Sequence, residues 1–187
     1  MHIRQKAVLL DRDGVINKEV NYLYRKEDFE FTNNCIDALL RLHQAGYLLF
    51  VITNQAGIGR GYYTESDFNI LNDWMVETLA EKGVVITDVM YCPHHPQHGQ
   101  GKYKLDCDCR KPKTGMIMPL VEKYNLDTAK SVLIGDKISD VESGFRAGIG
   151  TLLLVESGHK LPESIPGYVN GVYHNLHDLV FQRFAKR

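Results

Sequence analysis

Hydrophobic residues in this chain form short runs that alternate with stretches in which they recur at helical spacing. The short runs are rich in Val, Ile and Leu and predict buried strands at residues 7–10, 48–52, 84–91, 131–135 and 151–155, with a weaker strand at 169–173. The helical stretches lie at residues 35–42, 64–79, 116–124 and 139–147, and after Leu176. Gly46 and Gly148 follow two of them and predict helix ends, and Thr64 with Asp67 predicts a capping box at another start.

The regular alternation of strand and helix decides the expected fold class. Repeated strand–helix units imply a parallel sheet with helices on both faces, which is a doubly wound α/β fold. No low-complexity segment, internal repeat or linker rich in Pro, Gly and Ser divides the chain, so we expect a single domain over residues 1–187. No large insertion follows the first or the second strand, so we expect no cap domain above the site.

Composition narrows the function classes. The 22 Lys and Arg residues against 23 Asp and Glu residues give a net charge of −1, which argues against binding to nucleic acid or to a membrane. Hydrophobic residues at 44% are typical of a soluble globular domain, and no apolar run is long enough for a signal peptide or a membrane span. Three of the four cysteines lie within residues 92–109. Clustered thiols without an export signal indicate a reducing compartment, so we expect a cytoplasmic protein. We also expect it to be a monomer.

Polar side chains follow three of the predicted strands. Residues 11–14 read Asp-Arg-Asp-Gly, Thr53 and Asn54 follow the second strand, and residues 135–137 read Gly-Asp-Lys. In open α/β sheets ligands bind beyond the carboxyl ends of the strands, where these groups would meet. Carboxylates brought together there repel one another unless a divalent cation separates them, and Mg²⁺ prefers oxygen ligands. Each fragment alone is also a common turn, but together with Lys111 they predict a Mg²⁺ site.

A second cluster combines soft metal ligands. Three thiolates and one imidazole, the ligand set of a closed structural zinc site, are supplied by Cys92, His94, Cys107 and Cys109. His95 and His98 are alternatives to His94, and buried reduced cysteines are the competing explanation of the thiols. The loop between the two pairs has almost no apolar residues, so zinc would supply its order.

Three further features complete the pattern. Arg110 and Lys111 directly follow the last cysteine of the cluster, so an ordered zinc loop would hold both charges at the edge of the site. Cys35 lies on a predicted helix face and is interpreted as a small buried thiol. The glycine-rich residues 57–61 lack the spacing of a nucleotide-binding loop, so we predict a flexible loop there.

These motifs carry a resemblance that covers nearly the whole chain. Residues 11–14, Thr53 with Asn54, Lys111, and residues 135–140 resemble, in order and spacing, the four motifs of the haloacid dehalogenase superfamily. The stretches 54–61, 92–96 and 107–112 are similar to its zinc-containing branch. The resemblance implies a Rossmann-like phosphatase domain without a large cap, with a zinc-stapled loop at residues 92–109, that uses Mg²⁺ and structural Zn²⁺.

The resemblance also implies catalytic roles. Asp11 is expected to attack the phosphorus and form an aspartyl-phosphate, while Asp13 acts as general acid and then as general base. Asp11, the backbone carbonyl of Asp13, and Asp136 are expected to hold Mg²⁺. Lys137 and Asp140 are expected to support these ligands.

Thr53 and Lys111 are expected to hold the phosphoryl oxygens where charge accumulates in the transition state. The residues expected to contact the substrate are Glu19, Val20, Asn21, Tyr22, Thr53, Asn54, Gln55, Ala56, Arg110 and Lys111. Among these, Tyr22 is the aromatic residue of the flap, residues 19–31, that we expect at the substrate.

The expected substrate is a small phosphorylated sugar. Within the zinc-containing branch two substrates compete, a heptose 1,7-bisphosphate that loses its 7-phosphate and histidinol phosphate. The long loop inside the cysteine cluster and the flap favour the heptose, which implies a place in nucleotide-heptose synthesis toward lipopolysaccharide core. A non-catalytic, zinc-stabilised phosphate-binding module is the alternative from another class. The pair Asp11 and Asp13 argues against it, because two added negative charges only weaken the binding of phosphate.

Overall fold

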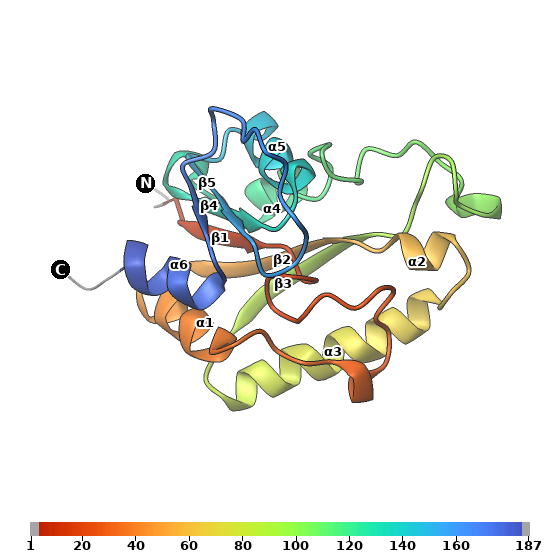
Figure 1. The fold of residues 1–187 in the computed structure, drawn as a ribbon, viewed down its shortest axis with the longest axis horizontal. Helices are drawn as coiled ribbons and strands as arrows, with labels where there is room; N and C mark the ends of the chain where they lie inside the picture. Colours follow the sequence, from red (N-terminus) through yellow and green to blue (C-terminus); the bar gives the residue numbers. More distant parts are fainter. Residues whose placement is uncertain (1–3, 185–187) are drawn as a thin grey trace.

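The computed structural model describes residues 4–184, which form a six-stranded sheet with helices on both of its faces (Figure 1). The strands are β1 (Ala7–Leu10), β2 (Leu48–Asn54), β3 (Ile86–Cys92), β4 (Val132–Gly135), β5 (Thr151–Val155) and β6 (Gly171–Tyr173). The α-helices are α1 (Cys35–Gln44), α2 (Ala56–Gly59), α3 (Glu65–Glu81), α4 (Met118–Lys123), α5 (Ile138–Arg146) and α6 (Leu176–Arg183). Short 3-10 helices lie at Lys26–Asp28, Gly101–Tyr103 and Thr128–Lys130.

The order of the strands brings three loops together. The strands lie in the order β3-β2-β1-β4-β5-β6, and every neighbouring pair is parallel. The direction in which the chain adds strands reverses between β1 and β4. Such a reversal opens a crevice at the carboxyl ends of the strands, so the loops that follow β1, β2 and β4 meet at one edge.

Strand β1 is buried on both faces, which explains its unbroken apolar run. Val8 and Leu10 pack with α1, α3 and α6, whereas Ala7 and Leu9 pack with α4 and α5 on the other face. All four side chains are completely buried. The loop that starts at Asp11 therefore extends from a strand that is buried on both faces and paired on both edges.

The predicted doubly wound fold is confirmed, and each predicted strand and helix is present, with small shifts of its ends. The strand predicted from residue 84 begins at Ile86, because Val84 still bonds back to the end of α3. The helix predicted from residue 116 begins at Met118, and Pro119 lies in its first turn, where no N–H is needed. The predicted capping box of Thr64 and Asp67 is formed.

The flexible loop predicted at residues 57–61 was wrong. The chain forms helix α2 there, and Gly57 and Gly59 are buried. A Cβ at Gly57 would lie 2.2 Å from the ring of Tyr63, and one at Gly59 would lie 2.5 Å from the carbonyl oxygen of Pro93. These glycines therefore permit close packing, and the sequence pattern alone did not distinguish that from flexibility.

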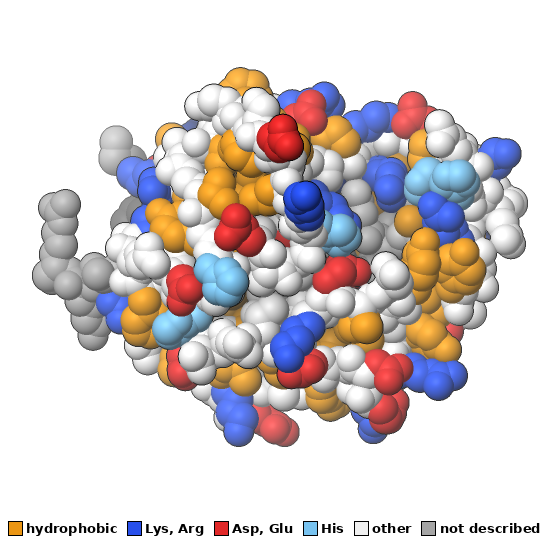
Figure 2. All heavy atoms as spheres, viewed as in Figure 1, with side chains coloured by type: hydrophobic (Ala, Val, Ile, Leu, Met, Phe, Trp, Pro, Cys, Tyr) orange, Lys and Arg blue, Asp and Glu red, His pale blue; other side chains and the backbone are white. Residues whose placement is uncertain are grey.

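The segment between β1 and α1 contains no inserted cap domain. Residues 11–34 form loops with only the 3-10 helix Lys26–Asp28, and the ring of Phe29 packs at 5.3 Å from that of Trp74. Cys35 begins α1 with 1% of its surface exposed, as predicted, and burial raises the pKa of its thiol to about 12. On the face drawn in Figure 2, basic and acidic side chains lie interspersed. Within residues 4–184, no helix has both the length and the apolar character that crossing a membrane requires.

Candidate active site

The side chain of Lys111 joins two carboxylates below the crevice. Its Nζ lies 2.8 Å from Asp11 Oδ1 and 2.8 Å from Asp140 Oδ1, and it donates a third bond of 2.8 Å to the carbonyl oxygen of Ile52. Lys111 is 3% exposed and Asp11 is 6% exposed. The ammonium group thus uses all three of its donors in a place that water scarcely reaches.

Burial and charge act in opposite directions on this pair. Burial raises the pKa of Asp11 well above its ordinary value, against the effect of Lys111, and the neighbouring carboxylates of Asp140, Asp136 and Asp13 raise it further. Burial alone would lower the pKa of Lys111, but Asp11 and Asp140 raise it instead. A site with this excess of buried carboxylates favours the entry of another cation.

Asp13 is held by donors on several sides. Arg12 donates bonds of 2.9 and 3.1 Å from Nη2 to the two oxygens, Asn17 donates at 3.0 Å, and Gln55 donates at 2.9 Å. Although burial alone would raise it, these groups lower the pKa of Asp13. The contacts favour the ionised carboxylate, which suits the base half of the predicted role. The acid half requires Asp13 to take up a proton against them.

The loop after β4 is fixed by Asp140, in the first turn of α5. Its Oδ2 accepts hydrogen bonds from the backbone N–H of Asp136 at 3.1 Å and of Lys137 at 2.9 Å. Ligand oxygens of Asp11, Asp136 and Asp140 all lie within 4.8 Å of one another. Oδ1 of Asp136 is buried without a hydrogen-bond partner among the described residues. Three close carboxylates with a free buried oxygen fit a hard divalent cation such as Mg²⁺.

The end of β2 positions Lys111 through its backbone. Asn54 Oδ1 accepts from the N–H of Lys111 at 3.0 Å, and Asn54 Nδ2 donates to its carbonyl oxygen at 3.2 Å. Gln55 bonds to the hydroxyl of Thr53 at 2.8 Å and accepts from Tyr63 at 2.5 Å. Because Gln55 also donates to Asp13, the ends of β1 and β2 belong to one polar network with Lys111.

A cleft of about 340 Å³ opens above this network. Most of the residues predicted from the sequence line it, namely Asp11, Asp13, Glu19, Val20, Asn21, Tyr22, Asn54, Gln55, Ala56, Arg110, Lys111, Lys137 and Asp140. Thr53 and Asp136 do not line the cleft and lie buried next to it, 1% and 0% exposed. The structure thus brings the predicted residues together, and their individual roles stay predictions.

Several residues of the cleft were not predicted from the sequence, namely Leu23, Gly57, Tyr63, Ser139 and His159. Tyr63 is the partner of Gln55, and Ser139 follows the Gly-Asp-Lys motif, so its position in the sequence was a usable signal. His159 gave no such signal, because it lies beyond β5 in a segment without a regular element. Its Nδ1 nevertheless lies 2.6 Å from Asp136 Oδ2.

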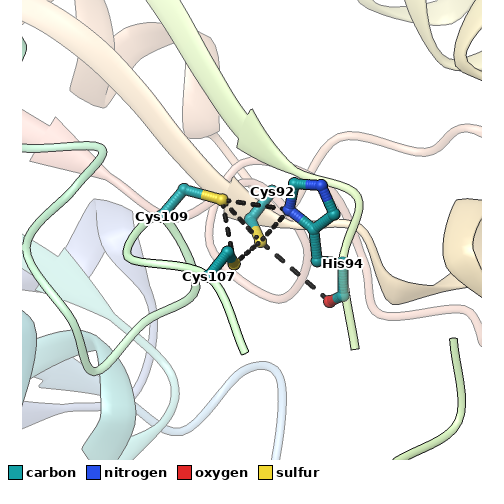
Figure 3. A group of neighbouring side chains, drawn as sticks. All are labelled: Cys92, His94, Cys107 and Cys109. Atoms are coloured by element: carbon teal, nitrogen blue, oxygen red, sulfur yellow. Dashed lines mark hydrogen bonds between the residues drawn. The ribbon is translucent and has the colours of Figure 1, made fainter. Parts of the chain in front are cut away.

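The soft ligands form a second cluster (Figure 3). The three sulfur atoms of Cys92, Cys107 and Cys109 lie 3.0 to 3.4 Å apart, and His94 Nδ1 is 3.4 Å from the sulfur of Cys109. The alternative ligand His95 instead accepts backbone N–H groups through its Nδ1. All four ligand atoms lie within 4.8 Å of one another, so they can hold one metal ion, and thiolates with an imidazole suit zinc.

Hydrogen bonds connect the loop around this cluster to helix α3 and to the cleft. Tyr103 donates to Glu65 on α3 at 2.6 Å, and Tyr91 donates to the same carboxylate at 2.8 Å. Arg110 donates to the carbonyl oxygen of His94 at 3.3 Å and lines the cleft. A metal that orders residues 92–109 thus also fixes Arg110.

The cysteine–histidine cluster gives a testable prediction. We expect one zinc ion per chain by elemental analysis. It should remain after a mild chelator removes Mg²⁺, because thiolates bind zinc far more strongly than carboxylates bind Mg²⁺. Cys107→Ala should lose the zinc and increase amide hydrogen exchange within residues 92–111, while the sheet stays protected. Cys35→Ala is the matched control and should keep the metal. Full zinc content in Cys107→Ala would contradict the site.

Comparison with known proteins places the chain in a family. Residues 108–180 match the HAD-hydrolase-like family model. The chain is 50% identical, over 87% of its length and 88% of the relative's, to the D-glycero-alpha-D-manno-heptose-1,7-bisphosphate 7-phosphatase of Photorhabdus laumondii. The chain belongs to the D-glycero-D-manno-heptose-1,7-bisphosphate 7-phosphatase family. The expectation of a phosphoric monoester hydrolase is confirmed, and the non-catalytic alternative is not supported.

Two further members of this family are informative. The D-glycero-beta-D-manno-heptose-1,7-bisphosphate 7-phosphatase of the same Photorhabdus strain is 40% identical, with 92% of each chain covered. A crystal structure of D,D-heptose 1,7-bisphosphate phosphatase from B. bronchiseptica, complexed with magnesium and phosphate, superposes with a TM-score of 0.78 at 28% identity. That comparison covers 95% of this chain and 97% of the other. The fold expected from the motifs is therefore the fold of this family.

Proposed function

We propose that the protein is a Mg²⁺-dependent phosphatase that removes the 7-phosphate of D-glycero-D-manno-heptose 1,7-bisphosphate through an aspartyl-phosphate on Asp11. The observation that carries the proposal is the position of Asp11: it directly follows β1, lines the cleft and accepts a hydrogen bond of 2.8 Å from Lys111. The names of the relatives support the substrate class.

The first chemical step uses the carboxylate of Asp11. One of its oxygens attacks the phosphorus, a new O–P bond forms, and the bond from phosphorus to the sugar oxygen breaks. The positive charge of Lys111 and the amides at the end of β2 stabilise the charge on the non-bridging oxygens. Because all three N–H groups of Lys111 have partners in the free protein, a direct bond to a phosphoryl oxygen requires the ammonium to exchange one of them, such as its bond to Asp11. Asp13 gives the departing oxygen a proton, which it must first acquire from solvent against the pull of Arg12.

The second step releases phosphate and restores the enzyme. Water attacks the phosphorus of the aspartyl-phosphate, Asp13 takes its proton, and Asp11 leaves as a carboxylate. Gln55 and Asn17 hold Asp13 in place for this reverse transfer, since both donate to its oxygens. Bound Mg²⁺, held by Asp11, Asp136 and the backbone carbonyl of Asp13, would neutralise the negative charge of the phosphoryl group.

The relatives also support a choice of anomer. One Photorhabdus strain contains both enzymes, and the chain is 50% identical to the one named for the alpha anomer and 40% identical to the one named for the beta anomer. We therefore propose the alpha anomer as the preferred substrate. Action as a cytoplasmic monomer, on the nucleotide-heptose route toward lipopolysaccharide core, is part of the same proposal and is tested by light scattering and by complementation.

A direct kinetic comparison tests the substrate. The kcat/KM values for alpha-heptose and beta-heptose 1,7-bisphosphate and for histidinol phosphate are measured side by side, and phosphorus NMR shows which phosphate is lost. We expect the alpha anomer to lead by at least about tenfold, or 1.4 kcal/mol. Faster turnover of histidinol phosphate would refute the proposed substrate, yet leave the Asp11 mechanism intact. A lead of the beta anomer would refute only the anomer.

Arg110 should select for the second phosphate. Its guanidinium can make charge-assisted bonds to a phosphate or hydroxyl outside the reacting group, so Arg110→Ala should reduce kcat/KM for the bisphosphate by about 1.5–3 kcal/mol. The same change should barely affect a small phosphate ester, which does not reach that far. Lys104→Ala removes an exposed charge from the zinc loop and serves as the control. Equal losses on both substrates would show that Arg110 acts on the reacting phosphate.

A further inference from the structure

A segment outside all of the sequence motifs closes one side of the carboxylate cluster. Residues 157–159 follow β5 and reach back over the loops after β1 and β4. The hydroxyl of Ser157 donates to the carbonyl oxygen of Gly14 at 2.7 Å. Two residues further, His159 Nδ1 lies 2.6 Å from Asp136 Oδ2. The segment therefore connects the nucleophile loop with the carboxylate at the end of β4.

Oδ2 of Asp136 lies so close to two glycines that neither position has room for a side chain. A Cβ at Gly14 would lie 2.5 Å from Asp136 Oδ2, and one at Gly158 would lie 2.0 Å from the same oxygen. Gly14 also has φ +87°, a conformation that other residues rarely adopt. Two glycines and the imidazole of His159 thus surround this one oxygen.

The other oxygen of Asp136 is in the opposite situation. Asp136 is 0% exposed, so water does not reach Oδ1, and this oxygen has no hydrogen-bond partner among the described residues. A buried oxygen without a partner is costly unless a further group occupies the position that it faces. The carboxylate therefore has one oxygen fixed by a donor and one kept free.

We propose that His159 is a positioning residue for the divalent cation: its Nδ1–H holds Asp136 Oδ2, and Asp136 Oδ1 is thereby kept for the metal. The inference rests on the Mg²⁺ part of the proposed function. Loss of a residue that orients a metal ligand by a hydrogen bond commonly lowers metal affinity or activity about 10- to 100-fold.

A competing partner of His159 is Glu19. Its Oε2 lies 3.9 Å from His159 Nδ1, beyond hydrogen-bond distance, whereas Asp136 Oδ2 is within it. The imidazole also lines the cleft and is only half-buried, so a substrate contact is a second competing role. The two roles are separable, because Mg²⁺ binding to the free protein requires no substrate.

The test uses two amides that place a donor at different positions on the side chain. His159→Asn puts an N–H₂ group near the position of Nδ1, His159→Gln puts it near Nε2, and His159→Leu has no donor. Mg²⁺ is titrated into each free, zinc-loaded protein by calorimetry. We expect the Kd for Mg²⁺ to rise about 10- to 100-fold in the Leu and Gln variants and to stay within about threefold in the Asn variant.

Further measurements separate positioning from a general structural effect. In the Leu variant, the Mg²⁺ concentration for half-maximal rate should rise with the Kd, while kcat at saturating Mg²⁺ returns close to the original value. Zinc content and urea unfolding should not change, and His174→Leu, at an exposed position outside the cleft, is the matched control.

Several results would overturn the proposal. Unchanged Mg²⁺ affinity in His159→Leu would refute it and leave the phosphatase assignment intact. An equal loss in His159→Asn would show that the ring, and not the Nδ1 donor, is required. A higher KM for the substrate with unchanged Mg²⁺ affinity would assign His159 to the substrate. If the unmodified protein neither bound Mg²⁺ nor hydrolysed the bisphosphate, the proposed function itself would fail.

Discussion

Asp11→Asn should abolish turnover of the bisphosphate while the protein stays folded. An amide keeps the shape of the side chain but has no anionic oxygen to attack phosphorus. Loss of the group that forms the covalent intermediate costs about 10⁴-fold or more in kcat. Its Oδ1 can still accept from Lys111, which retains Asp140 and the carbonyl oxygen of Ile52 as partners. Urea unfolding should therefore show little loss of stability.

The control for this variant is Asp37→Asn, an exposed position on α1, which should keep full activity. Acid quenching during turnover should trap a phosphoryl group on the peptide that contains Asp11 in the unmodified protein, and none in Asp11→Asn. Retention of more than about one percent of kcat, beyond what contaminating phosphatases supply, would identify another nucleophile.

The edge of the sheet where the site lies was predictable because strand ends carry a local signal. Asp11, Thr53 and Asp136 each end or follow an apolar run, and parallel strands place such ends at one edge whatever the details of packing. The residues predicted to bind zinc carried a similar signal in their spacing. The spacing alone did not distinguish His94 from His95. In the structure the ring of His94 faces the sulfur atoms, whereas the ring of His95 accepts a backbone N–H in a turn.

Other features depend on contacts between distant segments. His159 approaches Asp136 only because residues after β5 fold back over the central loops. Arg12 was predicted merely as part of a motif, yet it is 1% exposed and holds Asp13 through both carboxylate oxygens. Gly57 and Gly59 have the composition of a flexible loop and serve instead as close packing positions. Tertiary contacts decide all three cases, and local pattern contains no information on them.

The charge balance of the buried site leads to a prediction on stability. Lys111→Met keeps the length and much of the volume of the side chain but removes the ammonium group between Asp11 and Asp140. Both carboxylates then stay buried without their cation. Breaking a buried ion pair from one side destabilises a protein by about 3–5 kcal/mol. We expect a loss of this size in the free energy of unfolding, measured in urea without added Mg²⁺.

The pH dependence of that loss gives a second, independent check. Burial raises the pKa of Asp11, and removal of Lys111 takes away the main group that opposes this effect. The folded variant then binds more protons than the unfolded chain, so its stability must fall as pH rises through the raised pKa of Asp11. The loss should be smallest at acidic pH and largest at neutral pH and above. Added Mg²⁺ should recover part of it, since a cation among the carboxylates replaces the lost charge.

Lys137→Met provides the comparison for Lys111→Met. Lys137 lies in the same cleft but is exposed, and none of the described carboxylates forms an ion pair with its ammonium group. Its loss should change the free energy of unfolding by less than about 0.5 kcal/mol at any pH. If Lys111→Met were as stable as Lys137→Met without Mg²⁺, the buried carboxylates would not need the lysine. The tight charge coupling between Asp11 and Lys111 that underlies the proposed mechanism would then be wrong.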